Sequence, residues 1–158
     1  NDHTEASSNI LPEIREFERT STTTLNAYLQ PLVGSYLHKL ETALLQDGFS
    51  GEVLIVQSNG GVMTVETARR LPVRTALSGP AAGVIASAYI ATEAGFPNVI
   101  TCDMGGTSFD IGIVVEGGEK YYDFNPVIDR WLVSVPMVHL VTLGAGGGSI
   151  ASYDQLHE

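Results

Sequence analysis

The sequence contains a single cysteine, Cys102, and only 8 lysine and arginine residues against 18 acidic residues. One cysteine excludes an internal disulfide and fits a reducing cytoplasm, which is the location that we expect. The formal net charge is −10 at pH 7. Nucleic acids and anionic membrane surfaces bind basic faces, so neither is expected as a partner. A bound polyanion would have to be held by backbone N–H groups, a metal ion or a basic residue from elsewhere.

Long apolar runs are also missing, since no stretch reaches the roughly 18 residues that a membrane-spanning helix needs. The opening NDHTEASSNILPE is not a signal peptide. It lacks an initiator Met and is followed at once by regularly spaced apolar residues. We therefore expect residues 1–158 to be a piece of a longer protein, without an internal domain boundary. The hydrophobic content of 44% is sufficient for a globular core.

The apolar residues that are present follow helical and strand periods in turn, which predicts an α/β fold. Residues 25–44 have apolar side chains at spacings of three and four. They predict a helix that begins at Ser21 or Thr22 and stops at Gly48, with a kink or two abutting helices at Pro31. The other predicted elements are strands at 52–57, 72–77 and 98–103, helices at 64–70 and 78–95, and a hairpin of 109–115 with 119–124.

The segment DMGGTS overlaps the end of a predicted strand and brings together several residues that could bind a metal ion or a phosphate. Asp103 ends the strand, where a carboxylate could hold hydrated Mg²⁺. Gly105 and Gly106 can turn the backbone and present N–H groups to a phosphate, and Thr107 and Ser108 add hydroxyl donors. A plain hairpin turn would also need glycine and small polar residues. The residues alone therefore leave both a phosphate cradle and a simple turn open.

Four further features each allow two interpretations. Gly144–Gly148 lacks the spacing of a dinucleotide site and is either a flexible turn or a loop lining a cleft. SGPAAG at 78–83 is either an anion-binding helix start or a close helix–sheet contact. SNGG at 58–61 is either a plain turn or a cleft-facing one. His139 could touch substrate or metal but is more often structural, and Cys102 is predicted to lie in a core strand.

Five blocks of the sequence, taken together, resemble the hydantoinase A/5-oxoprolinase family, which includes the ATP-binding subunits of acetone and acetophenone carboxylases. The resemblance covers nearly the whole chain. DMGGTSFDIG is also similar to the second phosphate-binding hairpin of the actin, sugar-kinase and heat-shock-chaperone ATPases. The blocks are, in order, LPEIREFERTSTTTLNAYLQP, QSNGG, LSGPAAGVIAS, CDMGGTSFDIG and GAGGGSIA.

This resemblance implies a segment of an actin-like/sugar-kinase (ribonuclease H-like) ATPase domain, with a mixed sheet, a β-hairpin and packed helices. It implies ATP-dependent phosphorylation of a carbonyl or cyclic amide, followed by hydrolysis or carboxylation. The implied cofactors are ATP and Mg²⁺ or Mn²⁺, and the substrate would be a hydantoin, 5-oxoproline or a ketone. The implied partners are the remainder of the polypeptide and a hydantoinase B-type subunit. The alternative is a non-catalytic, ATP-gated interaction module of the same fold.

The resemblance also assigns roles to residues. Asp103 would be catalytic and would orient the metal ion or a water, and the segment from Gly105 to Ser108 would bind the β- and γ-phosphates. Asp110 would support the turn or the metal. The loop residues expected to line the nucleotide or substrate cleft are Gly146, Gly147 and Gly148.

Two departures from the family pattern affect these expectations. Phe109 stands where the family usually has Thr, which is similar to the carboxylase branch. The first phosphate-binding hairpin of the family is absent from residues 1–158. Because half of the ATP cleft would then be missing, we expect the chain alone to be inactive and to bind nucleotide weakly at most.

Overall fold

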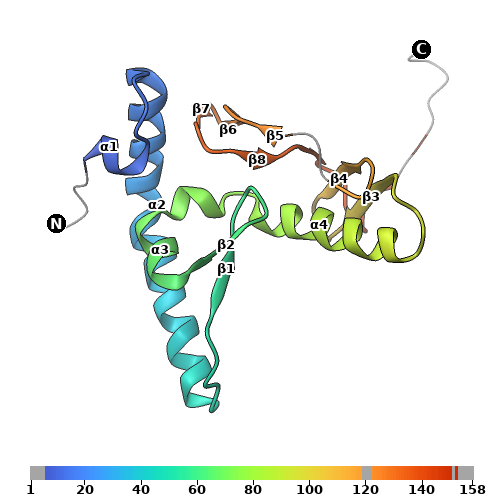
Figure 1. Ribbon diagram of the computed structural model, residues 1–158, viewed down its shortest axis with the longest axis horizontal. Coiled ribbons are helices and arrows are strands. Elements are labelled where there is room, and N and C mark those ends of the chain that lie inside the picture. Colours follow the sequence, from blue (N-terminus) through green and yellow to red (C-terminus); the bar gives the residue numbers. More distant parts are fainter. Residues whose placement is uncertain (1–5, 119–121, 151, 153–158) are drawn as a thin grey trace.

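A computed structural model describes residues 6–118, 122–150 and 152 of the chain (Figure 1). The long helix α2 stands on one side, and α4 extends away from it toward the strands β3 and β4. The elements are, in chain order, α1 (Ser7–Ile10), α2 (Glu16–Gln46), β1 (Leu54–Val56), β2 (Val62–Thr64), α3 (Val65–Arg70), the 3₁₀ helix η1 (Pro72–Thr75), α4 (Ser78–Glu93), β3 (Val99–Met104), β4 (Phe109–Val114), β5 (Tyr122–Asp123), β6 (Val127–Ile128), β7 (Trp131–Leu132), β8 (Met137–Val138) and β9 (Leu140–Leu143).

Helix α2 is a single helix of 31 residues that begins earlier than the sequence predicted. The expected N-caps Ser21 and Thr22 lie inside it, because the favourable first turn, with Glu16 and Glu18 near the positive end of the helix dipole, lies upstream. Pro31 also lies within the helix, so the alternative of two abutting helices is wrong. The predicted end is confirmed, since the residue after the helix cap, Gly48, has a φ of +84°.

The segment after α2 forms a short hairpin and two short helices. Strands β1 and β2 pair antiparallel, and Thr64 then caps α3 by accepting a hydrogen bond from the N–H of Thr67. The strand predicted at 72–77 is wrong, because this segment contains η1. Pro72 begins η1, where a missing N–H costs nothing, and the Thr75 hydroxyl donates to the Pro72 carbonyl at 2.7 Å.

The main sheet has three antiparallel strands in the order β3-β4-β9. Helix α4, predicted at 78–95, is confirmed and covers one face of this sheet. Val84 on the helix packs with Val99 and Val114 on the strands. Gly112 is required at the centre of this contact, because a β-carbon there would overlap the Val84 side chain.

The other face of the same sheet is largely exposed in the described part of the chain, and this corrects two predictions. The strand predicted as buried at 98–103 is buried at Thr101 but exposed at alternate positions. Cys102, expected in the core, is exposed. An apolar strand sequence predicts burial on both faces, whereas among the described residues mainly the face toward α4 is covered.

The predicted hairpin of 109–115 with 119–124 is wrong. A tight turn does form there, with an isolated bridge between Val115 and Gly118 and left-handed φ at Gly117. The strands do not continue from it: β4 pairs with β3 and β9, and β5 pairs with β8. Residues 119–121 lie outside the described residues. Turn chemistry was therefore readable from the sequence, whereas the choice of strand partner was not.

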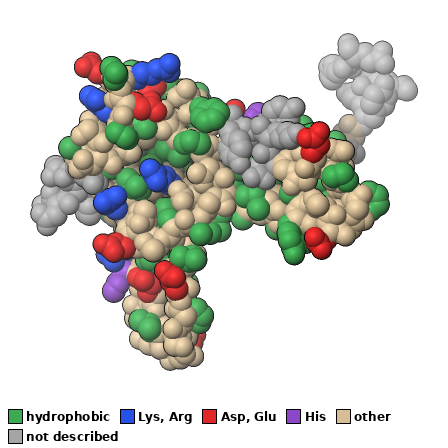
Figure 2. Space-filling view, viewed as in Figure 1, with side chains coloured by type: hydrophobic (Ala, Val, Ile, Leu, Met, Phe, Trp, Pro, Cys, Tyr) green, Lys and Arg blue, Asp and Glu red, His purple; other side chains and the backbone are tan. Residues whose placement is uncertain are grey.

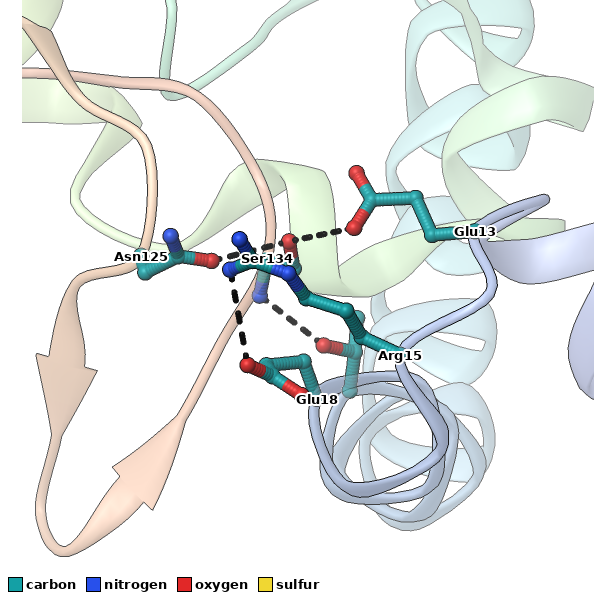
Figure 3. A network of polar contacts seen from close by, with 6 residues as sticks. Glu13, Arg15, Glu18, Asn125 and Ser134 are labelled. Atoms are coloured by element: carbon teal, nitrogen blue, oxygen red, sulfur yellow. Dashed lines mark hydrogen bonds and ion pairs between the residues drawn. The ribbon is translucent and has the colours of Figure 1, made fainter.

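A separate apolar cluster connects the C-terminal strands to α2. Val73 in η1 packs with Val133 and Met137, and the buried Ser134 lies beside them along the chain. The Ser134 N–H donates to the Thr22 hydroxyl at 2.9 Å. Figure 3 shows Ser134 between Asn125 and Glu13, with its hydroxyl 3.0 Å from the Asn125 side-chain oxygen and 3.4 Å from the Glu13 carboxylate.

The architecture is thus α/β, as predicted. All strand pairs in the described part of the chain are antiparallel, so the mixed sheet that we expected is not found among these residues. None of the helices in the described ranges is long and apolar enough to cross a bilayer.

Candidate phosphate-binding site

The hairpin of β3 and β4 places two carboxylates directly opposite each other. Asp103 and Asp110 are register partners, so both side chains lie on the face that α4 covers. Facing side chains in an antiparallel pair have β-carbons about 4.5–5.5 Å apart, and two like charges at that spacing repel. A pair of this kind gains stability when a cation lies between or above the carboxylates. A cation-binding role for this pair stays a prediction.

A small cavity adjoins these carboxylates between the helix and the sheet. It has a volume of about 200 Å³, and its lining includes Asp103, Asp110, Gly83 and Ser87. A β-carbon on Gly83 would lie 3.8 Å from the Asp103 carboxylate, in ordinary van der Waals contact, so the helix lies directly beside the acid. The cavity is large enough for several waters or a hydrated ion.

Strand β9 contributes a residue that the sequence analysis missed. Thr142 is the register partner of Asp110, and its hydroxyl donates to the Asp110 carboxylate at 2.5 Å. This bond fixes one oxygen of Asp110 and leaves Asp103 without an equivalent anchor in the described part of the chain. The signal was the alternation in VTL before GAGGG, which places Thr142 on the face of Asp110 once β9 is paired with β4.

The turn of the hairpin presents unused hydrogen-bond donors. Gly105 donates its N–H to the Ser108 carbonyl at 2.9 Å, which closes the turn. The N–H groups of Gly106 and Thr107, and the hydroxyls of Thr107 and Ser108, find no acceptor among the described residues. Gly106 and Thr107 are exposed. The turn therefore offers donors without competing intramolecular partners, as an anion-binding loop requires.

The structure brings the second glycine-rich loop against the first. Gly147 donates its N–H to the Gly105 carbonyl at 3.0 Å. Gly146 is buried, and a β-carbon on it would overlap the Gly106 carbonyl and lie 2.6 Å from the Thr107 nitrogen. Only glycine permits this approach of two backbones. The contact places the loop expected to line a cleft beside the loop expected to bind phosphates.

Gly146 also closes its own loop, because its N–H donates to the Ser149 hydroxyl oxygen at 3.0 Å and its carbonyl accepts from the Ser149 N–H at 2.8 Å. Gly146 thus helps to fix the loop, and its place in a cleft stays a prediction. A β-carbon on Gly148 would meet no atom within 4 Å. Gly148 therefore has open space beside it, as does Gly144 at the start of the loop.

The alternatives for the other motifs are partly decided by contacts. In SGPAAG, Ala81 is in the core and Gly83 lies beside Asp103, which supports close packing. In SNGG, the buried Ser58 donates to the carbonyl of Ala76, and Gly60 has a φ of +84° against the Ile85 side chain. That segment is a structural turn. Anion binding by the first turn of α4 stays a prediction.

His139 lies at the other end of β9 from the glycine-rich loop. Its Nδ1 atom is 2.8 Å from the Asp123 carboxylate, and both side chains are about half exposed. A larger cavity of about 840 Å³ lies elsewhere, between α2 and the β6–β7 turn, and its lining includes Phe17 and Trp131. Neither feature lies among the residues that line the cavity beside Asp103.

The site contains no cationic side chain of its own. The sequence has no Lys or Arg between Arg74 and Lys120, nor from Leu140 to the end of the chain. Figure 2 shows Lys and Arg side chains over the α2–α3 side and none over the visible surface of α4 and its sheet. Among the described residues, no group of three or more His, Cys, Asp or Glu side chains could hold a metal ion. A phosphate here would rely on backbone donors and on a cation held by the two carboxylates.

Comparisons with known proteins identify the relatives. The chain is 40% identical over 149 residues to the acetophenone carboxylase gamma subunit of Aromatoleum aromaticum, covering 94% of this chain and 20% of that protein. It is 42% identical over 145 residues to the caprolactamase subunit alpha of Pseudomonas jessenii, covering 92% of this chain and 21% of that protein. The chain therefore spans about a fifth of the length of these relatives.

Solved structures of the same types of enzyme also match this chain. A nucleotide-free acetone carboxylase structure, from a study of ATP-dependent acetone carboxylation, matches 96% of this chain with a TM-score of 0.81 and 31% identity, over 21% of its own chain. The ATP-dependent caprolactamase from Pseudomonas jessenii matches 94% with a TM-score of 0.70 and 36% identity, over 21% of its own chain. The hydantoinase/oxoprolinase family model matches residues 19–158. The chain belongs to the hydantoinase/oxoprolinase family.

Proposed function

We propose that the chain forms the second phosphate-binding region of an ATP-dependent enzyme that phosphorylates a carbonyl or cyclic amide. The observation that carries this proposal is the contact between the two glycine-rich loops beside the Asp103–Asp110 pair. It combines unused N–H donors with carboxylates at one edge of a sheet. One structural neighbour is an acetone carboxylase, which carries out ATP-dependent acetone carboxylation, and another is an ATP-dependent caprolactamase, which supports ATP as the bound nucleotide.

Each group has a role that follows from its position. The N–H groups of Gly106 and Thr107 donate to β- or γ-phosphate oxygens, and the hydroxyls of Thr107 and Ser108 add donors at the same turn. Catalysis of phosphoryl transfer depends mainly on positioning and charge neutralisation, so fixed backbone donors suit this task. Thr142 holds Asp110 in place and thereby keeps the carboxylate pair oriented toward the cavity.

The carboxylate pair fits Mg²⁺ or Mn²⁺. Mg²⁺ is usually bound through one or two carboxylates together with water and substrate phosphates, and does not need a full protein cage. Asp103 and Asp110 are the residues that would hold it. When bound, the ion would neutralise phosphate charge that no basic side chain in this region neutralises.

The substrate class and the partner follow from the relatives. The two relatives of nearly equal identity are a carboxylase subunit and a lactamase subunit, so the proposal covers both outcomes: hydrolysis of a hydantoin, 5-oxoproline or similar lactam, and carboxylation of a ketone. Both are subunits by name, and we propose a partner subunit of the hydantoinase B type. A cytoplasmic location remains a prediction from the single cysteine.

The experiment that tests ATP binding uses the chain itself. A ¹⁵N-labelled sample is titrated with MgATP at millimolar concentrations, and amide chemical shifts are followed by NMR. Weak binding is expected, with shifts concentrated at Gly105–Ser108 and Gly146–Gly148. Tripolyphosphate, which has the three phosphates but no nucleoside, should shift the same amides if the phosphates are what the loops bind. The absence of shifts in both loops, with shifts elsewhere, would contradict the proposed site.

A further inference from the structure

The turn between β1 and β2 contacts two segments that lie far from it along the chain. Ser58, at the start of this turn, is 1% exposed. Its N–H donates to the Arg74 carbonyl at 2.7 Å, and its carbonyl accepts from the Val138 N–H at 2.9 Å. Its hydroxyl lies 2.7 Å from the Arg74 carbonyl oxygen and 2.5 Å from that of Ala76. Ser58 therefore joins the linker between η1 and α4 to strand β8.

The linker that Ser58 holds contains a strained residue. Leu77 follows Ala76, is the N-cap of α4, and has a φ of +58° and a ψ of +19°. This left-handed conformation is unfavourable for leucine, because the β-carbon crowds the backbone, and a leucine side chain cannot cap a helix. The Ala76 carbonyl belongs to the peptide group that precedes Leu77, so a hydrogen bond to its oxygen fixes the orientation of that peptide. The Ser58 hydroxyl therefore holds the conformation from which α4 begins.

Gly60 fixes the same turn against the side of α4. It has a φ of +84°, and a β-carbon on it would overlap the Ile85 side chain. Ile85, on α4, packs against the core cluster that contains Ala81 and Val84. The β1–β2 turn thus meets α4 both through the linker and along the helix (Figure 1). Two contacts with one helix restrict its position as well as its rotation.

Both segments bonded to Ser58 continue into elements of the candidate phosphate site. Helix α4 lines the cavity beside Asp103. Strand β9 begins two residues after the end of β8 and carries Thr142, whose hydroxyl donates to Asp110. One carboxylate is therefore reached through α4 and the other through β9, and Ser58 is bonded to the segment that precedes each element.

We propose that Ser58 is a positioning residue of the candidate phosphate site. Its hydroxyl sets the start of α4 and its carbonyl holds the strand that leads into β9, so together they place the two carboxylates relative to each other. Ser58 is not among the residues that line the cavity beside Asp103, so it acts through the helix and the strand. The kinetic part of this proposal rests on the proposed function, whereas the geometric part does not. A serine with a merely structural role would affect stability alone.

The kinetic test uses Ser58→Ala, which removes the hydroxyl and keeps both backbone hydrogen bonds. It is made in a full-length polypeptide of this family that contains residues 1–158, and turnover is measured well below the melting temperature of the variant. We expect kcat for ATP turnover to fall about 10- to 100-fold, because small displacements of catalytic groups have effects of this size. An unchanged kcat would overturn the proposal.

The matched control for this test is Leu37→Ala. Leu37 is 3% exposed and packs with residues of β2 and α3, away from α4 and the three-stranded sheet. Its truncation should lower the melting temperature, because it leaves a cavity in the core. At a temperature where the variant is folded, kcat should stay at the wild-type value. A fall in kcat as large as that of Ser58→Ala would show that any destabilisation has this effect, and would overturn the positioning role.

Hydrogen–deuterium exchange of the same polypeptides without nucleotide tests the geometry independently of ATP. Ser58→Ala should speed the exchange of amides in residues 77–87 and 103–108 at least about fivefold, because local opening becomes easier, whereas Leu37→Ala should not. Absence of ATP turnover in the wild-type polypeptide would contradict the proposed function, and exchange would then decide the role of Ser58. Equal exchange at residues 103–108 in the wild type and in Ser58→Ala would overturn the proposal.

Leu77→Gly tests whether Ser58 acts through the strained linker. Glycine adopts a positive φ without strain, so the double variant Ser58→Ala/Leu77→Gly should regain most of the exchange protection that Ser58→Ala loses. Leu77 is 46% exposed, so loss of its side chain removes little packing. If Ser58→Ala alone fails to fold, the double variant should still fold. A double variant as damaged as Ser58→Ala would overturn the proposal.

Discussion

Two regions of the molecule use polar side chains in opposite ways. Around α2, buried polar groups hold the structure: Asn26 is 1% exposed, donates to the Arg70 carbonyl at 3.0 Å and accepts from the Val73 N–H at 3.2 Å. In the sheet beneath α4, other groups pack closely against the backbones of Gly112 and Gly146, and one buried hydrogen bond, from the Gly112 N–H to the Thr101 hydroxyl at 3.1 Å, lies beside them. There the hydroxyls and carboxylates near the turn stay accessible.

The difference explains why a ligand site belongs to one region and not the other. A buried polar group must find a partner within the protein, because leaving it unpaired costs about 1–3 kcal/mol. Ser58 follows this rule, because its hydroxyl lies within hydrogen-bonding distance of the Arg74 and Ala76 carbonyls. Glycine contacts satisfy packing without using side-chain donors. The sheet region can therefore be ordered while Thr107 and Ser108 remain free to bind a ligand.

The largest expected effect tests the functional half of this comparison. In a polypeptide of the relatives' length that contains residues 1–158, called the extended protein below, Asp103→Asn should lower ATP turnover by about 10²–10³, the range for loss of one electrostatic contact in a transition state. The fold should persist, because Asp103 is exposed and Asn is nearly isosteric. Steady-state kinetics measures the effect, with Asp47→Asn as a surface control. Wild-type turnover in the Asp103 variant would make this carboxylate structural.

The next effect tests the structural half. Asn26→Ala should lower the free energy of unfolding by about 2–3 kcal/mol, because the buried Val73 N–H loses its acceptor. Urea unfolding of the isolated chain measures it. Gln30→Ala is the matched control: Gln30 also donates to the Arg70 carbonyl at 3.0 Å but is less buried, so its loss should cost under about 1 kcal/mol. Equal costs for the two variants would contradict the role given to burial.

A smaller effect separates two adjacent glycines. Gly146→Ala should destabilise the chain by about 1–3 kcal/mol, because its β-carbon would overlap the Gly106 carbonyl. Gly147→Ala should be tolerated, since its β-carbon would lie 3.8 Å from the nearest carbonyl, that of Gly105. Thermal melts of both variants measure the difference. If Gly147→Ala proved the more damaging, the loop contact would be arranged differently from the one described.

The smallest stability effect carries the sharpest functional test. Gly106 is outside the left-handed region, and a β-carbon there would meet no atom within 4 Å, so Gly106→Ala should change the free energy of unfolding by less than about 0.5 kcal/mol. ATP binding should nevertheless be lost, because the methyl group would occupy the place of the phosphate oxygens. Calorimetry of the extended protein measures it. Gly118→Ala, in equally open space, is the control and should bind ATP normally. Unchanged affinity at Gly106 would leave DMGGTS a plain turn.

Much of the candidate site was predictable because its chemistry is local in sequence. Strand, turn and strand around DMGGTS follow from apolar runs on both sides of a glycine pair, and the structure confirms β3 and β4 at those positions. The sequence likewise predicted the start of α3 near Thr64, the end of α2 at Gly48 and helix α4, because these signals depend only on nearby residues.

What the sequence could not determine depends on pairing between distant segments. The position of Thr142 beside Asp110 required β9 to pair with β4, across a gap that contains four other strands. The exposure of Cys102 required knowing that α4 covers one face of the sheet and that the other face is largely exposed in the described part of the chain. Apolar content signals that a strand can be buried, but only the tertiary structure decides which face is covered, because burial is a property of the neighbouring element and not of the strand.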